Sequence, residues 1–298
     1  MSTLVLKTWR DPYDAGFSPT TPRTVEFHPG LTVLVGCNGA GKSTLLLNLA
    51  EFCRKSEIPY LEYDNLKDGG GNALGELFYQ GNYDEGAYLF SSSEGESIKA
   101  NLGCKARLFA EFIKSGIVDD TSYRIFKAFS DKEKSFDSND RVFIFDAVDS
   151  GLSVDSIIEV KTMFDLVLED NKDSGKNLYI VIAANEYELA RNSDCFDVNA
   201  GKYLHFADYE DYRTFIINSR KKKEARIEKQ IKWREKQKEK ERKQFYQVKA
   251  KQEETLEKLH LKKEQGKYVS SWEEHDAEQM LEDFFRHSRF LSKKDVGL

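Results

Sequence analysis

Apolar residues over the first two hundred positions follow two alternating patterns, which predict strands and helices in turn. Short runs of β-type apolar residues are typical of strands, and apolar residues spaced three and four apart are typical of helices. The predicted strands cover residues 4–7, 24–27, 31–35, 59–63, 142–145 and 177–184. The predicted helices cover residues 43–54, 97–117 and 154–168. Such an alternation predicts an α/β fold with a mainly parallel sheet.

The pattern changes near Tyr209, where Lys, Glu, Arg and Gln become dominant. No Pro and a single Gly occur before Lys267, so we expect one long basic helix that ends at Gly266. Its apolar residues form pairs without a sustained heptad, which does not support a strong coiled coil. A short amphipathic segment is expected at 278–291. We therefore divide the chain into a head, 1–205, and a basic helical arm, 206–298.

Charge is distributed unevenly along the 298 residues. The whole chain has 45 Lys and Arg against 51 Asp and Glu, a net charge of −6, whereas 220–267 has 19 basic residues against 9 Glu. Such an asymmetry indicates a surface for nucleic acid or for an acidic partner. No apolar stretch approaches ~18 residues, so no transmembrane helix and no membrane partner are expected. No secretory leader follows Met1 and the four cysteines lie far apart, which favours a cytoplasmic location.

The strongest chemical motif is the segment from Gly36 to Ser43, which fits the pattern G-x-x-x-x-G-K-[ST]. It follows an apolar strand and opens a predicted helix, which is the context of a phosphate-binding P-loop. Glycines allow successive backbone amides to face a phosphate, and the helix N-terminus adds partial positive charge. Lys42 would bind the β- and γ-phosphates of ATP, and the Ser43 hydroxyl would bind Mg²⁺. The apolar strand that ends at Asp146 would place a carboxylate beside this ion as its second protein ligand.

Extended to Thr44, this loop resembles the G-x-N-G-x-G-K-S-T loop of the ABC-class ATPases. Within that class it is most similar to the soluble SMC/RecF/RecN-like branch and to small ATP-binding proteins of phages and mobile elements. Residues 149–153 resemble the D-loop, and residues 93–96 resemble the signature motif with glutamates in place of a glycine and the glutamine. Asn185 stands where the family has its switch histidine, and Gln80 matches the Q-loop glutamine. The resemblance covers about residues 1–205.

The resemblance implies an ABC-type head that forms a head-to-tail homodimer with ATP between the two chains. Ser93 and Gly95 of one chain would then contact the γ-phosphate bound by the other chain. The residues implied for nucleotide binding are Gly36, Asn38, Gly39, Ala40, Gly41, Lys42, Ser43, Thr44, Ser93, Gly95 and Asn185. Those implied for the metal are Ser43, Asp146 and Gln80.

The position directly after Asp146 departs from the family, which has a catalytic glutamate there. Ala147 cannot accept a proton or orient water. Three explanations remain open at this stage: slow natural hydrolysis with ATP-gated dimerisation, a catalytic role for Asp149, or a deliberate Glu→Ala change. Asn185 can still bond a phosphate, but it carries no charge.

The basic segment 220–267 has two competing interpretations. It is either a nucleic-acid arm, with Trp233, Phe245 and Tyr246 close to its lysines, or a solvated helix that holds a protein partner. The first interpretation favours an ATPase that couples nucleotide state to DNA or RNA. The second favours a hydrolysis-poor scaffold that binds a protein effector in a mobile-element or anti-phage system. A transporter subunit is disfavoured by the degenerate signature motif and the basic arm.

Overall fold

The computed structural model describes residues 3–8, 24–65, 84, 109–116, 127–128 and 138–297. By their contacts these residues fall into two compact units. The first, which we call the head, ends at Lys223, and the second, which we call the hairpin unit, begins at Glu224. Each unit is described below by itself.

A seven-stranded sheet with the order β5-β4-β6-β7-β3-β8-β9 forms the centre of the head. The five strands from β4 to β8 in this order are parallel, and β5 and β9 pair antiparallel at the two edges. The bounds are β3 Gly30–Val35, β4 Tyr60–Asp64, β5 Lys127–Ala128, β6 Asp140–Asp146, β7 Asn177–Ala183, β8 Asp194–Asp197 and β9 Lys202–Leu204. The predicted α/β class with a mainly parallel sheet is confirmed.

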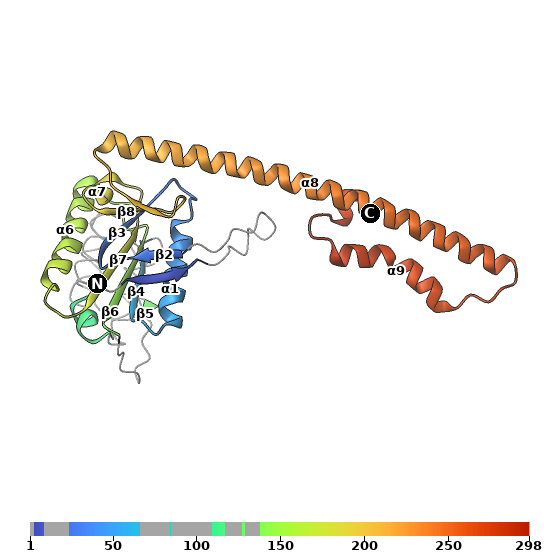
Figure 1. Ribbon diagram of the computed structural model, residues 1–298, viewed down its shortest axis with the longest axis horizontal. Helices are drawn as coiled ribbons and strands as arrows, with labels where there is room; N and C mark the ends of the chain where they lie inside the picture. Colours follow the sequence, from blue (N-terminus) through green and yellow to red (C-terminus); the bar gives the residue numbers. More distant parts are fainter. Residues whose placement is uncertain are drawn as a thin grey trace. The chain divides into compact units, whose positions relative to one another are not determined.

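Both faces of this sheet are covered, because alternate residues of each strand point to opposite sides. On one face, α1 (Lys42–Lys55) and the antiparallel pair β1 (Leu4–Lys7) and β2 (Thr24–Phe27) pack against residues such as Leu34 and Ile144. On the other face, α6 (Val154–Asp170), α7 (Tyr187–Ala190) and the helical residues 109–115 pack against residues such as Val33 and Phe145. Figure 1 shows α1 and α6 on opposite sides of the sheet.

The head also includes the first turns of α8 (Tyr209–Glu264). Tyr212 is buried in the core on the α6 side, and Phe206, Phe215 and Ile216 pack against that core. The compact unit therefore continues past residue 205, the end of the head expected from the sequence, as far as Lys223.

Most predicted elements of the head agree with the structure to within two residues at each end. The strands β8 and β9 were not predicted, because β8 has only Cys195 and Phe196 as apolar residues and β9 is three residues long. Their stability comes from pairing with β3 and with each other, which no local pattern reveals. For the predicted helix 97–117, only residues 109–116 are described, and a left-handed Gly116 follows its last turn.

The hairpin unit consists of α8 from Glu224 onward, α9 (Ser271–His287) and the short helix η3 (Lys293–Val296). Gly266 follows α8 with a positive φ of 70°, as expected for a residue that ends a helix. The predicted bounds 278–291 for the last helix were wrong. Its start is fixed by a capping box between Ser270 and Glu273 that precedes the apolar residues, and it ends at His287.

Aromatic contacts hold the hairpin unit together. Phe245 of α8 is 1% exposed, and its ring centroid lies 5.9 Å from Phe284 and 5.5 Å from Phe285 of α9. Close by, Glu241 accepts hydrogen bonds from the Ser288 hydroxyl and from three backbone amides, those of residues 289–291. One carboxylate of α8 therefore accepts four hydrogen bonds from the segment after α9, and Lys238 adds an ion pair with Asp295.

Candidate functional site

The glycine loop, residues Gly36–Thr44, lies at the carboxyl end of β3 and leads into α1. Gly36, Gly39 and Gly41 all have positive φ angles, of 149°, 73° and 105°. A Cβ at Gly36 would lie 2.9 Å from that of Ala40, so this turn closes too tightly for a side chain. Gly41 is the N-cap of α1, and no side chain caps the helix there. The first amides of α1 therefore have no partner within the helix.

Lys42, the first residue of α1, extends back into the loop. Its ammonium donates to the carbonyl of Gly36 and to Oδ1 of Asn185, both at 2.9 Å. Burial lowers the pKa of this ammonium below its ordinary value of 10.5, while Asp149, Cys37 and Asp146 act in the opposite direction. Within the described part of the chain, Lys42 forms no ion pair, although it is only 8% exposed. The loop thus surrounds a desolvated cation whose hydrogen-bond partners are neutral.

Asp149, the candidate catalytic residue, is 6% exposed and is engaged with the backbone at the end of β7. Its Oδ2 accepts hydrogen bonds from the amides of Asn185 at 2.5 Å and Glu186 at 2.8 Å. The other oxygen, Oδ1, is buried and has no hydrogen-bond partner among the residues that the structure describes. These contacts are those of a group that fixes the position of Asn185, and the catalytic role of Asp149 stays a prediction.

Asp146 and Ser43 are the two described members of the predicted metal set. Asp146 ends β6 and is half-buried, and Ser43 is exposed in the first turn of α1. Carboxylate and hydroxyl oxygens are suitable ligands for Mg²⁺. No group of three or more His, Cys, Asp or Glu side chains suited to a metal occurs among the described residues. A magnesium ion held here would therefore need phosphate oxygens and water to complete its shell.

Ala147 adopts a left-handed conformation, with φ of 53°. Such a conformation is uncommon for residues with a Cβ and costs of order 1 kcal/mol or more. It occurs between Asp146 and the buried Val148, so the backbone turns sharply where β6 ends. The position that the family resemblance gives to a catalytic glutamate is thus half-buried and strained.

Three residues of α8 contact this site, and none of them was selected by the sequence patterns. The Ser219 hydroxyl accepts hydrogen bonds from the Cys37 amide at 3.1 Å and from Nδ2 of Asn199 at 2.9 Å. Lys223 donates to the carbonyl of Asn38 at 2.7 Å, and Tyr212 donates to the carbonyl of Asn185 at 2.6 Å. The separations of seven and four residues put all three on one face of the helix. That spacing could have indicated a shared helix face from the sequence. Lys223, however, cannot be distinguished by sequence from the two lysines that precede it.

The structure brings most of the predicted site residues to one edge of the sheet. Gln80, Ser93 and Gly95 lie outside the described residues, so their predicted roles stay predictions. The residues placed at the loop or next to it are Gly36, Asn38, Gly39, Ala40, Gly41, Lys42, Ser43, Thr44, Asp146, Asp149 and Asn185.

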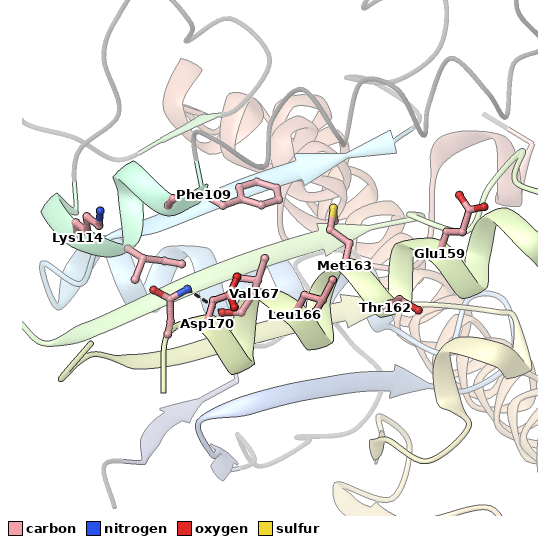
Figure 2. A pocket seen from close by; sticks show the side chains of 11 residues that line it. Phe109, Lys114, Glu159, Thr162, Met163, Leu166, Val167 and Asp170 are labelled. Atoms are coloured by element: carbon pink, nitrogen blue, oxygen red, sulfur yellow. Dashed lines mark hydrogen bonds between the residues drawn. The ribbon is translucent and has the colours of Figure 1, made fainter. Parts of the chain in front are cut away.

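A separate cavity of about 620 Å³ lies between the helical residues 109–115 and α6. Figure 2 shows Phe109, Met163 and Val167 around it, with Lys114, Glu159 and Asp170 among the polar residues of its lining. None of the predicted site residues lines this cavity.

The hairpin unit carries a row of exposed lysines along α8, which we call the lysine stripe. Its members follow each other at steps of three or four residues: Lys229, Lys232, Lys236, Lys240 and Lys243. Among the described residues, only Lys243 of this stripe forms an ion pair, with Glu239 at 3.2 Å. Helical geometry places the stripe away from Glu241 and Phe245, which contact α9 or the segment that follows it. Trp233, four residues after Lys229 and three before Lys236, lies on the same face as the stripe and contacts Phe290.

Of the three aromatic residues close to the lysines of 220–267, two make contacts inside the hairpin unit. Phe245 is buried, and the ring of Trp233 lies 5.4 Å from that of Phe290 in an edge-to-face arrangement. Only Tyr246 is largely exposed, at 55%. The nucleic-acid interpretation of the segment 220–267 stays a prediction.

No protein-family model matches the chain, and no curated protein shows significant similarity to it. Among the helices that the structure describes, none is both long and apolar enough to cross a membrane.

Proposed function

We propose that the chain is a P-loop ATP-binding protein that holds ATP and Mg²⁺ at the glycine loop. The observation that carries this proposal is the buried ammonium of Lys42, which among the described residues has only neutral acceptors within hydrogen-bond distance. A phosphate would give this desolvated cation a negatively charged hydrogen-bond partner, through shorter and stronger charge-assisted bonds. The uncapped N-terminus of α1 adds further donors for the same anion.

The sheet topology supports the same location. In open α/β sheets, ligands bind outside the carboxyl ends of the strands, where successive connections leave in opposite directions. After β3 the chain moves to β4 on one side, and after β7 it crosses β3 to reach β8 on the other. The glycine loop follows β3 and so lies at this switch point.

Mg²⁺ would be held by the Ser43 hydroxyl and the Asp146 carboxylate, together with phosphate oxygens. When bound, the ion would neutralise charge on the β- and γ-phosphates. The chain's own contribution is to orient the phosphates through the backbone of the loop and Lys42. Asp149 contributes by holding Asn185 against the Lys42 ammonium.

Hydrolysis is expected to be slow, because Ala147 offers no group to polarise water. ATP then acts chiefly as a ligand that joins two heads, as the resemblance to ABC-class ATPases implies. In this arrangement Ser93 and Gly95 of one chain complete the site of the other. Light scattering of the Ser93→Arg variant with ATP and Mg²⁺ should then give a monomer where the parent chain gives a dimer.

The lysine stripe supports nucleic acid as the partner of the hairpin unit, since it presents five cations along one helix face. Replacing all five lysines by Gln should lower the slope of log affinity against log salt by about 0.7–0.9 for each phosphate that the stripe neutralises in the parent chain. The matched control replaces the exposed lysines Lys55, Lys172 and Lys202 of the head. Unchanged salt dependence in the stripe variant would instead favour a protein effector as the partner.

Thermal unfolding with and without ATP–Mg²⁺ tests the proposed nucleotide site on the whole chain. A ligand that binds only the folded state stabilises it by about 2.7 kcal/mol at a hundredfold excess over its dissociation constant. We expect a rise in Tm with ATP–Mg²⁺ and a smaller rise with AMP, which lacks the phosphates that Lys42 would bind. Equal Tm values with and without ATP–Mg²⁺ would contradict the proposal.

A further inference from the structure

We propose that α8 holds the nucleotide loop in place through the hydrogen bonds of Ser219 and Lys223, which we call the grip. We propose further that these contacts become closer when the loop binds a nucleotide. The inference rests on the proposed nucleotide site and adds positioning residues to it. It also gives the first turns of α8 a role in sensing nucleotide.

The grip consists of two contacts on consecutive residues of the loop. Ser219 is 4% exposed, and its hydroxyl holds the Cys37 amide. Four residues later, Lys223 holds the carbonyl of Asn38. Its ammonium would lie 2.5 Å from a Cβ built at Gly39, so a side chain at this position would oblige the lysine to shift.

A third contact from the same helix face reaches the other side of the site. Tyr212 donates to the carbonyl of Asn185, whose side chain accepts from Lys42. Burial raises the pKa of the Tyr212 phenol, so this hydroxyl stays a proton donor over the physiological range. One rigid helix face therefore contacts both the loop and the residue that holds the loop lysine.

Occupation of the loop by a triphosphate changes the charges that act on these contacts. The Lys42 ammonium would exchange neutral acceptors for phosphate oxygens, because charge-assisted bonds are stronger. The Lys223 ammonium, which donates to the carbonyl of Asn38 in the same loop, is attracted by the same negative charge. The attraction of Lys223 favours a closer association of residues 219–223 with the loop.

The test compares Lys223→Ala with Lys222→Ala, an exposed lysine one position earlier on α8. Two quantities are measured on the full-length chain: the affinity for ATP–Mg²⁺ and the hydrogen-exchange rates of the amides at 209–223. In the parent chain and in Lys222→Ala, ATP–Mg²⁺ should slow exchange of these amides. In Lys223→Ala we expect this slowing to disappear and the affinity to fall by about fivefold, the low end of measured couplings.

Lys223→Arg separates positioning from a general structural effect, because Arg can restore both the charge and the donor. We expect it to recover the slowing of exchange and most of the affinity. Equal ATP responses in Lys223→Ala and Lys222→Ala would overturn the grip while leaving the nucleotide site in place. Absence of ATP binding by the parent chain would overturn the proposed function and, with it, the grip.

Discussion

Oδ2 of Asp149 lies 2.5 Å from the backbone nitrogen of Asn185 and accepts its hydrogen bond, which joins the segment after β6 to the end of β7. Asn185 in turn accepts a hydrogen bond from the ammonium of Lys42 through Oδ1. The order of contacts is therefore Asp149 to Asn185 to Lys42. A carboxylate that the sequence offers as a candidate for catalysis fixes the hydrogen-bond partner of the loop lysine in this structure.

Replacing Asp149 by Ala should weaken both the fold and the site. Two backbone amides lose their acceptor, and an unsatisfied buried donor costs about 1–3 kcal/mol. We expect the free energy of unfolding to fall by that amount in urea titrations, together with weaker ATP–Mg²⁺ binding. Asp173→Ala, an exposed carboxylate after α6, is the control and should change neither quantity. Full stability in Asp149→Ala would show that these bonds contribute nothing.

Restoring a carboxylate after Asp146 should turn a slow site into a hydrolytic one. A positioned general base contributes about 10²–10⁴-fold to rate, so Ala147→Glu should raise phosphate release by a factor in that range. The double variant Lys42→Ala, Ala147→Glu provides the background, because it retains the new carboxylate without the lysine for phosphate. If Ala147→Glu binds ATP but releases phosphate no faster than the parent chain, the assigned catalytic position is wrong.

The hairpin unit should depend strongly on Phe245. Phe→Ala changes in a packed core cost about 3–5 kcal/mol, and this ring is buried against Phe284 and Phe285. Hydrogen exchange of the α9 amides should accelerate accordingly in Phe245→Ala. Tyr268→Ala is the matched control, since Tyr268 is 88% exposed, and we expect a change within about 0.5 kcal/mol. Equal exchange in both variants would mean that α9 is held by other contacts.

The stability of the hairpin unit should fall at acid pH because of Glu241. Burial alone would raise the pKa of this carboxyl, but hydrogen bonds from Ser288 and three backbone amides lower it below its ordinary 4.5. A carboxyl with a lowered pKa stabilises the folded state above its unfolded pKa. That stability is lost as pH falls through the folded value.

Glu241→Gln isolates this contribution, because Gln keeps an acceptor oxygen but does not titrate. We expect α9 protection to decline below about pH 4.5 in the parent chain and to vary less steeply in Glu241→Gln. The same pH dependence in both proteins would assign the acid sensitivity to other carboxyls.

Sequence patterns predicted the central elements of the head well, because in buried strands and amphipathic helices the spacing of apolar residues follows the face that is buried. The run 31–35 and the helix that follows it are examples, and the structure places them within one residue of the predicted bounds. The glycine loop was predictable for a similar reason, since three residues with positive φ require glycines at fixed positions.

Other parts of the site depend on contacts between distant residues. Ser219 reaches Cys37 across 182 positions, and nothing in the local sequence of α8 indicates that contact. Phe245 gives a second example, because its burial depends on α9 folding back along α8. From the sequence of a basic helix alone, an aromatic residue that will be buried cannot be distinguished from one that will be exposed. The distinction depends on where the partner helix packs.

The most direct test of the central claim is titration calorimetry of ATP–Mg²⁺ into the parent chain, Lys42→Ala and Lys55→Ala. Lys55 is an exposed lysine at the other end of α1 and bonds only to Glu51 among the ion pairs of the described residues. We predict saturable binding with one ATP per chain in the parent and in Lys55→Ala, and no detectable binding in Lys42→Ala. Equal affinity in all three proteins would contradict the assignment of the glycine loop as the ATP site.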